Sequence, residues 1–260
     1  MLQAWHRAKV ITYAGYILGF PNDTPESIAR DIRILQRELP IDLVEFFMLT
    51  PLPGSKDHQE LYRQGVQMSS DLNNYDVEHA VTAHAGMTAA EWQSIYDQAW
   101  HLYYSPEHIA TLLRRAKVSG IRTTRLAFTI FYFYASYAFE HVHPLQSGVL
   151  RRKNRRQRRC TYPRENIAAY LLRRTRDFFG TYPPGLRFLW RLELLRRKIE
   201  REPNEHAIPD LALEPITDEY GDGLELFNAT ESARHAADQA IARANGHTPA
   251  NQHVVEVHPV

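Results

Sequence analysis

Cysteine is almost absent from this chain, which has a single one, Cys160, among 260 residues. One cysteine excludes a disulfide framework, and it excludes any metal site built from several thiolates of this chain. The scarcity is typical of a reducing compartment. Histidines stand in two pairs, His79 with His84 and His141 with His143. Because neither pair has cysteine or carboxylate support, we expect these side chains to form hydrogen bonds and no metal site.

Long hydrophobic runs are also missing. The longest apolar run, residues 126–139, has 14 residues, whereas a membrane-spanning helix needs about 20. The first 20 residues lack the apolar core and the cleavage site of a signal peptide. Neither a glycine-rich phosphate loop nor a nucleophile elbow occurs in the sequence. We therefore expect a cytoplasmic protein, either soluble or held peripherally at the inner face of the membrane.

The net charge of +1 indicates no particular partner, but the charges are unevenly distributed. Residues 151–202 hold 17 Lys/Arg against five Asp/Glu, and residues 203–260 hold two Arg against ten Asp/Glu. The densest part begins at Arg151 and ends at Arg159, with seven basic residues in nine. Because the aromatic segment 131–139 lies close to this cluster in sequence, we favour an anionic membrane surface over nucleic acid as its binding partner. The alternative is a solvated basic face followed by a disordered acidic tail.

The first fifty residues predict a strand, a helix and a second strand. Residues 9–18 and 42–49 are apolar and β-prone, and residues 25–38 have apolar side chains at helical spacing. Thr24 is typical of an N-cap, and Pro25 suits the first helical position. Short links between these elements predict a βαβ unit with parallel strands. Since parallel strands need neighbours and cover on both faces, we expect further strands from outside this chain. A small complete α+β domain is the alternative.

Helical patterns dominate the remaining sequence. Thr88 and Glu91 form a capping box, and Ser105 with Pro106 begins a second helix. We expect another helix in the aromatic segment, and helices over 163–202 that are interrupted at Gly180 and at residues 183–185. The predicted fold class is α/β followed by a mostly α-helical extension. Its parts are a βαβ unit (1–56), a helical segment (57–120), an aromatic and basic helical extension (121–202) and an acidic, disordered tail (203–260).

Two motifs at the predicted strand ends carry a family resemblance. Residues 16–25, YILGFPNDTP, resemble the strand-to-helix motif found late in the barrel of radical S-adenosylmethionine enzymes. Residues 48–55, MLTPLPGS, resemble the end of the next strand in that family. In the first motif we expect Asp23 and Thr24 to cap the following helix. Residues 75–116 and 141–146 are similar to the region that follows the barrel in the cobalamin-associated members, so the resemblance covers about residues 1–200.

The resemblance implies the end of a partial (β/α) barrel, with S-adenosylmethionine, a [4Fe–4S] cluster and cobalamin as cofactors of the parent enzyme. It implies that Ile17, Gly19, Leu49 and Thr50 contact the adenosyl part of S-adenosylmethionine. The implied activity is reductive cleavage of S-adenosylmethionine, used to methylate or otherwise modify an unactivated carbon. The family holds its cluster on three closely spaced cysteines. This chain has only Cys160, so we expect it to be inactive alone and assign it no catalytic residue.

Two alternatives stay open at this point. In a split enzyme, a separate chain would supply the cluster and the first barrel strands. In a non-catalytic protein, the basic helices would bind a membrane or nucleic acid.

Overall fold

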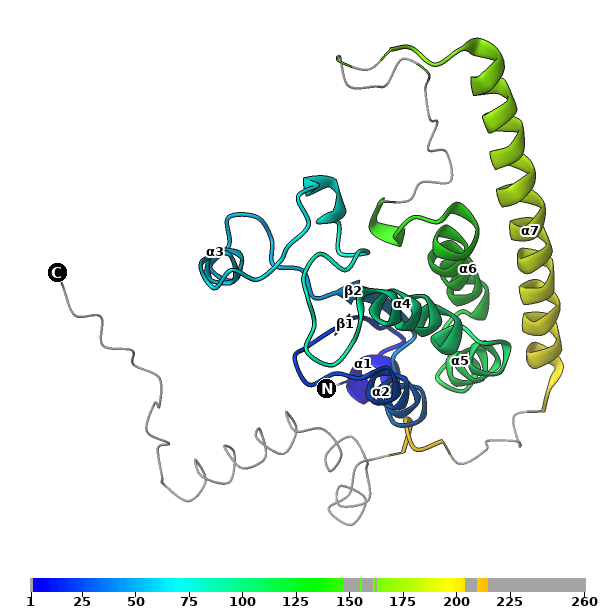
Figure 1. Ribbon diagram of the computed structural model, residues 1–260. Coiled ribbons are helices and arrows are strands. Elements are labelled where there is room, and N and C mark those ends of the chain that lie inside the picture. Colours follow the sequence, from blue (N-terminus) through cyan, green and yellow to red (C-terminus); the bar gives the residue numbers. More distant parts are fainter. Residues whose placement is uncertain (1, 147–154, 156–160, 162, 204–209, 215–260) are drawn as a thin grey trace, which may run out of the picture. The chain divides into compact units, whose positions relative to one another are not determined.

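A computed structural model describes residues 2–146, 155, 161, 163–203 and 210–214 (Figure 1). Residues up to Leu213 form one compact unit, and a second unit, Glu214–Val260, lies outside the described residues except for Glu214. Most of the predicted acidic tail and of the basic cluster therefore falls outside the description. In chain order the helices and strands are α1 (Leu2–Arg7), β1 (Tyr13–Leu18), α2 (Pro25–Glu38), β2 (Leu43–Met48), α3 (Lys56–Arg63), η1 (Leu72–Asn74), α4 (Ala89–Tyr103), α5 (Pro106–Val118), α6 (Thr123–Glu140), η2 (Pro144–Gln146) and α7 (Ile167–Arg201).

The predicted βαβ unit is confirmed. β1 and β2 pair in parallel, in a register that runs from Tyr13 opposite Leu43 to Leu18 opposite Met48. β1 begins later than predicted, because α1 occupies the preceding residues and Lys9 adopts a left-handed conformation with φ of 62°. The described part of the chain contains no third strand. The fold is thus mixed α/β and mostly helical, while its place in a larger barrel stays a prediction.

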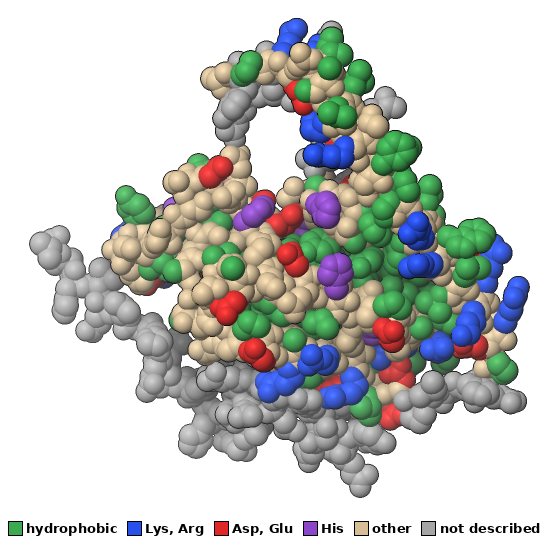
Figure 2. Space-filling model, turned by 45° about the vertical axis from the view of Figure 1, so that its right-hand side comes forward, with side chains coloured by type: hydrophobic (Ala, Val, Ile, Leu, Met, Phe, Trp, Pro, Cys, Tyr) green, Lys and Arg blue, Asp and Glu red, His purple; other side chains and the backbone are tan. Residues whose placement is uncertain are grey.

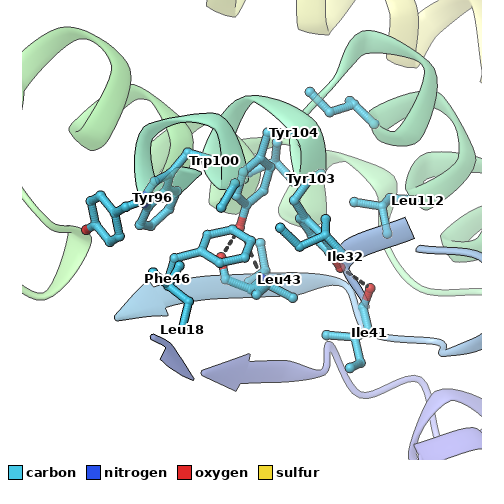
Figure 3. Packing of buried hydrophobic residues seen from close by; sticks show 14 of the residues in the cluster. Leu18, Ile32, Ile41, Leu43, Phe46, Tyr96, Trp100, Tyr103, Tyr104 and Leu112 are labelled. Atoms are coloured by element: carbon cyan, nitrogen blue, oxygen red, sulfur yellow. Dashed lines mark hydrogen bonds between the residues drawn. The ribbon is translucent and has the colours of Figure 1, made fainter. Parts of the chain in front are cut away.

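One face of the sheet forms the core. Phe46 packs against two rings of α4, with ring centroids 5.3 Å from Trp100 and 6.2 Å from Tyr103. Ile28 and Ile32 of α2 are fully buried in the same cluster. Figure 3 shows aromatic side chains of α4 and of the following Tyr104 lying over the strands, with the hydroxyls of Tyr103 and Tyr104 bonded to backbone carbonyls. This packing covers both strands of the sheet on one side.

The two edges of the sheet differ. Beyond β2, Tyr104 Oη donates to the Val44 carbonyl at 2.8 Å and accepts from its N–H at 3.2 Å. The His143 Nε2 lies 3.2 Å from the Phe46 carbonyl, and Met48 N donates to Val77 O at 2.7 Å. Beyond β1, the backbone groups of three alternate residues have no hydrogen-bond partner in the described part of the chain. These residues are Tyr13, Gly15 and Ile17. β2 is therefore a closed edge and β1 an open one.

The predicted helix starts are confirmed at three sites. Thr24 and Thr88 each form a capping box, with Ser27 and Glu91 as the respective partners. The Ser105 side chain accepts from the third residue of α5, and prolines occupy the first positions of α2 and α5. These caps satisfy N–H groups that the helices themselves leave unpaired.

The predicted interruptions in the last helix are wrong. α7 is continuous through Gly180, Pro183 and Pro184. Each proline removes one N–H from the helix and crowds the carbonyl four residues earlier, and α7 remains helical through both prolines where it packs against α6. Thr181 Oγ1 donates to the Phe139 carbonyl at 3.2 Å, and Gly185 is buried. Figure 1 shows α7 running beside α6 and α5.

The aromatic segment is helical as predicted, and most side chains of α6 are buried or half-buried, whereas Phe128 is 64% exposed. Phe131 and Phe133 pack against the core, and Phe188 of α7 lies 6.2 Å from Phe131 and 6.1 Å from Phe139 between ring centroids. No helix in the described ranges is long and apolar enough to cross a membrane.

Candidate ligand site at the carboxyl ends of the strands

A cavity of about 470 Å³ lies where β1 and β2 end. Gly19 follows β1, and Leu49 and Thr50 follow β2, and all three line the cavity. These are three of the four residues that the family resemblance implied. The fourth, Ile17, is not part of the lining: its side chain is 45% exposed and lies on the same face of β1 as Tyr13.

Trp92 of α4 fixes the conformation around Gly19. Gly19 has a φ of +99°, and a Cβ atom added there would lie 2.1 Å from Cζ2 of Trp92. Only glycine combines this backbone conformation with so close an aromatic neighbour. Trp92 lines the cavity, and its buried Nε1 has no hydrogen-bond partner among the described residues.

The turn between β1 and α2 is held by a carboxylate. Asp23 Oδ2 accepts from the N–H groups of Gly19 and Phe20, both at 2.8 Å. The expectation that Asp23 caps α2 was therefore wrong, whereas Thr24 does cap that helix. The Asp23 carboxylate binds the backbone of the preceding residues because the left-handed Gly19 turns those two N–H groups toward it. The geometry of this wall of the cavity depends on that contact.

His84 forms another wall and has a defined tautomer. Gly86 N donates to His84 Nδ1 at 3.0 Å, so Nε2 carries the proton and donates to the Phe20 carbonyl at 2.8 Å. The imidazole lies 5.3 Å from Trp92 between ring centroids. His84 thus joins the segment before α4 to the β1–α2 turn. With both ring nitrogens engaged, this histidine positions the wall and is not free to ligate a metal ion.

Helix α3 closes the remaining side. Leu61 contributes an apolar side chain to the lining, and Asp57 and Glu60 contribute carboxylates that are exposed at the rim. Thr50 Oγ1 donates to the Met48 carbonyl at 3.0 Å, which leaves its lone pairs open to a donor. The site therefore combines an apolar floor with hydrogen-bond acceptors at the mouth. Such a cavity can hold a planar apolar group and bind hydroxyl or ammonium groups beside it.

A polar pair, Tyr13 and Glu45, lies on the other face of the sheet and was not predicted from the sequence. The Tyr13 hydroxyl donates to Glu45 Oε2, and the Glu45 side chain is fully buried, with Oε1 unpartnered among the described residues. Burial raises the pKa of Glu45, against a smaller opposing effect of the Tyr13 hydrogen bond, and it also raises the pKa of Tyr13. One signal was available: Glu45 is the only charged residue in the otherwise apolar LVEFFM strand.

No metal centre emerges from the described residues, among which no group of three His, Cys, Asp or Glu side chains is suitably placed. Cys160 lies outside them. His79 contacts Asp76, and His143 contacts the Phe46 carbonyl. With its single cysteine, this chain does not fit an iron–sulfur cluster, which needs several thiolates.

Comparisons of the chain with family models, with curated proteins and with solved structures found no match. The roles of the cavity residues therefore depend on geometry and on the sequence motifs alone. The basic cluster lies outside the described residues except for Arg155, which donates to the Glu165 carbonyl at 3.0 Å.

Proposed function

We propose that the cavity at the ends of β1 and β2 binds the adenosyl part of S-adenosylmethionine. In this proposal the chain is the final βαβ portion of a radical S-adenosylmethionine enzyme of the cobalamin-associated kind. One observation carries the proposal: Gly19, Leu49 and Thr50, from two motifs thirty residues apart, line a single cavity. Its volume of about 470 Å³ is within the usual range of small-molecule sites, about 300–1,000 Å³.

Each part of the cavity has a role in this proposal. The Trp92 indole lines the cavity and offers an apolar surface for adenine. Gly19 lets the ligand approach the backbone closely. Asp57 and Glu60 at the rim are acceptors for the ribose hydroxyls or for the ammonium group of the methionyl part.

The electron for cleavage would come from a [4Fe–4S] cluster held by a segment outside this sequence, with cobalamin as a further cofactor of the parent enzyme. The open edge of β1 supports this division, because unpaired backbone groups at a parallel strand favour the addition of another strand. That strand belongs to the same polypeptide or, in a split enzyme, to a separate chain.

Calorimetric titration of the chain with S-adenosylmethionine tests the site. Leu61→Trp fills the cavity from α3, and we expect it to weaken binding about tenfold. Tyr62→Trp is the matched control: Tyr62 is the next residue of α3, is 74% exposed and does not line the cavity. Methionine alone should not bind, since the proposed contacts are made to the adenosyl part. Equal affinities for the two variants, or no heat of binding in the unaltered chain, would contradict the proposal.

A further inference from the structure

α7 carries a row of large, exposed apolar side chains. The row has one residue every four positions, a spacing that places consecutive members next to each other while the row turns about 40° around the helix at each step. Its members are exposed by 42–68%: Phe178, Tyr182, Leu186, Trp190 and Leu194. At 1.5 Å per residue the row is about 24 Å long. Four further exposed apolar residues lie toward the start of the helix, namely Ile167, Leu171, Leu172 and Phe179.

The members of this row are not the residues that α7 buries in the core, although Tyr182 and Leu186 also line a groove between α7 and α6. Gly185, Leu192 and Ile199 are the buried residues of α7, and Phe188 packs with the rings of α6. None of these residues belongs to the row. α7 thus exposes apolar side chains beyond those that the core buries. An exposed apolar surface of this length is unusual where a helix meets only water.

Positive charge lies beside the row. α7 contains nine Lys/Arg against three Asp/Glu. Glu193 forms ion pairs with Arg196 and Arg197, with N–O distances of 2.8 and 2.6 Å. Arg187 and Arg191 have exposed side chains and form no ion pair within the described residues. Figure 2 shows green and blue side chains next to each other along the right-hand part of this face.

We propose that this face of α7 binds the surface of an anionic membrane, with the helix lying in the plane of the interface. Phenylalanine, leucine and tryptophan side chains enter the boundary between headgroups and acyl chains, while the arginines contact lipid phosphates. This arrangement matches the order of side chains on α7, where Arg187 and Arg191 directly follow Leu186 and Trp190 and lie along one side of the row. Membrane binding would also cover the exposed apolar side chains between Ile167 and Leu194, which extend along most of the 35-residue helix.

Two other partners fit the observations less well. Nucleic acid would neutralise the arginines but would leave the apolar row in water, because its phosphates offer no apolar contact. A second protein chain would cover the row, but a protein interface is typically depleted of charge at its centre, and it would need acidic groups for Arg187 and Arg191. An anionic bilayer offers both an apolar layer and phosphates along the full length of the helix.

Co-sedimentation with vesicles tests the proposal. The probes are vesicles of phosphatidylcholine with one-quarter phosphatidylglycerol, and vesicles of phosphatidylcholine alone. We expect binding to the anionic vesicles that weakens as salt is raised, because screening reduces the contribution of the arginines. Trp190→Ser should weaken this binding about tenfold, since it removes the largest apolar side chain of the row.

The chain supplies a matched control. Leu72 is 68% exposed, the same fraction as Trp190, but lies in η1 and far from α7 in sequence. Leu72→Ser should leave vesicle binding unchanged. The double variant Arg187→Gln with Arg191→Gln should reduce binding to anionic vesicles and flatten its salt dependence. Neither residue supports the core, so circular dichroism should show an unchanged fold.

Three outcomes would overturn the proposal. The first is vesicle binding that Trp190→Ser leaves unaffected. The second is a dimer in analytical ultracentrifugation that the same variant converts to a monomer, together with no binding to vesicles, since a second copy would then cover the row. The third is displacement of the chain from vesicles by duplex DNA at equal charge, which would assign the arginines to nucleic acid.

Discussion

The guanidinium of Arg115 donates two hydrogen bonds to the carboxylate of Asp210, at 2.6 Å from Nε and 2.8 Å from Nη2. It also donates to the carbonyls of Gln36 and Leu39 at the end of α2, at 2.9 and 3.2 Å. The Arg115 side chain is only 3% exposed. One buried side chain on α5 therefore joins the βαβ unit to a segment far along the chain.

Replacement of Arg115 tests this junction. Arg115→Lys keeps the charge but loses the planar fork that serves both partners. We expect the free energy of unfolding to fall by about 2 kcal/mol, because buried acceptors are left unpaired. Urea denaturation is the measurement. The control is Arg114→Lys: Arg114 makes a similar two-bonded pair with Glu202 but is 39% exposed, and a surface pair contributes about 0–1 kcal/mol. Equal losses in the two variants would show that burial does not matter here.

Glu45 should make stability depend on pH. Its pKa is raised in the folded chain by burial, so the folded state binds the proton more tightly than the unfolded state. Its contribution to stability is therefore greatest at low pH, where the carboxyl is protonated in both states. That contribution is lost as the pH rises from the unfolded pKa of about 4.3 through the raised folded value.

The variant Glu45→Gln removes this titration and can still accept from the Tyr13 hydroxyl. Relative to the unaltered chain, it should gain stability between pH 4 and pH 7, by about 1 kcal/mol at neutral pH. Urea denaturation at several pH values measures the difference. Glu60→Gln, at an exposed carboxylate, should show no such trend. A difference between Glu45→Gln and the unaltered chain that is independent of pH would refute the assignment.

Gly19 should tolerate no side chain. Gly19→Ala combines a left-handed backbone with a contact to Trp92 that has no room for Cβ, so we expect a loss of about 3 kcal/mol or more in unfolding free energy. Gly54 has a similar φ of +89° with nothing within 4 Å of an added Cβ. Gly54→Ala isolates the backbone strain, about 1–2 kcal/mol. Thermal and urea denaturation of both variants compare the two costs, and equal costs would mean that Trp92 can move aside.

The chain alone should not cleave S-adenosylmethionine. After anaerobic reconstitution with iron and sulfide, we expect no stoichiometric [4Fe–4S] absorbance, because one cysteine is available where the cluster needs three. Chromatography for 5′-deoxyadenosine is the activity measurement. A separate chain with the three-cysteine loop should restore both signals if it adds to the open edge of β1. Robust 5′-deoxyadenosine formation by the chain alone would refute the proposed division.

Local signals predicted the parts of this fold that local chemistry determines. The capping boxes at Thr24 and Thr88 and the parallel strands follow from neighbouring residues, and so they could be derived from sequence. The closed edge of β2 could not be derived from sequence, because Tyr104 and His143 reach it from distant segments. Single polar contacts of this kind produce no periodic pattern in the sequence. The continuity of α7 was missed because local propensity opposes it and packing on α6 overrides that propensity.

The candidate site likewise combines residues that local sequence features indicate with residues that only distant contacts bring together. The motifs indicated Gly19, Leu49 and Thr50, because glycine at a strand end and a strand-ending turn are local features. The sequence indicated His84 only as one of a pair of histidines, and Trp92 only as one position within residues 75–116. Their role depends on a contact across about seventy residues of sequence, for which a single sequence carries no signal.

The closed edge of β2 also sets a limit on stoichiometry. Sheets with two free edges can add strands on both sides and grow without end, as in fibres. Here Tyr104, His143 and Val77 occupy one side, so two copies of the chain paired through their β1 strands would leave no free edge on either side. Self-association through this sheet therefore stops at a dimer, and increasing the concentration of the chain saturates it rather than polymerising it.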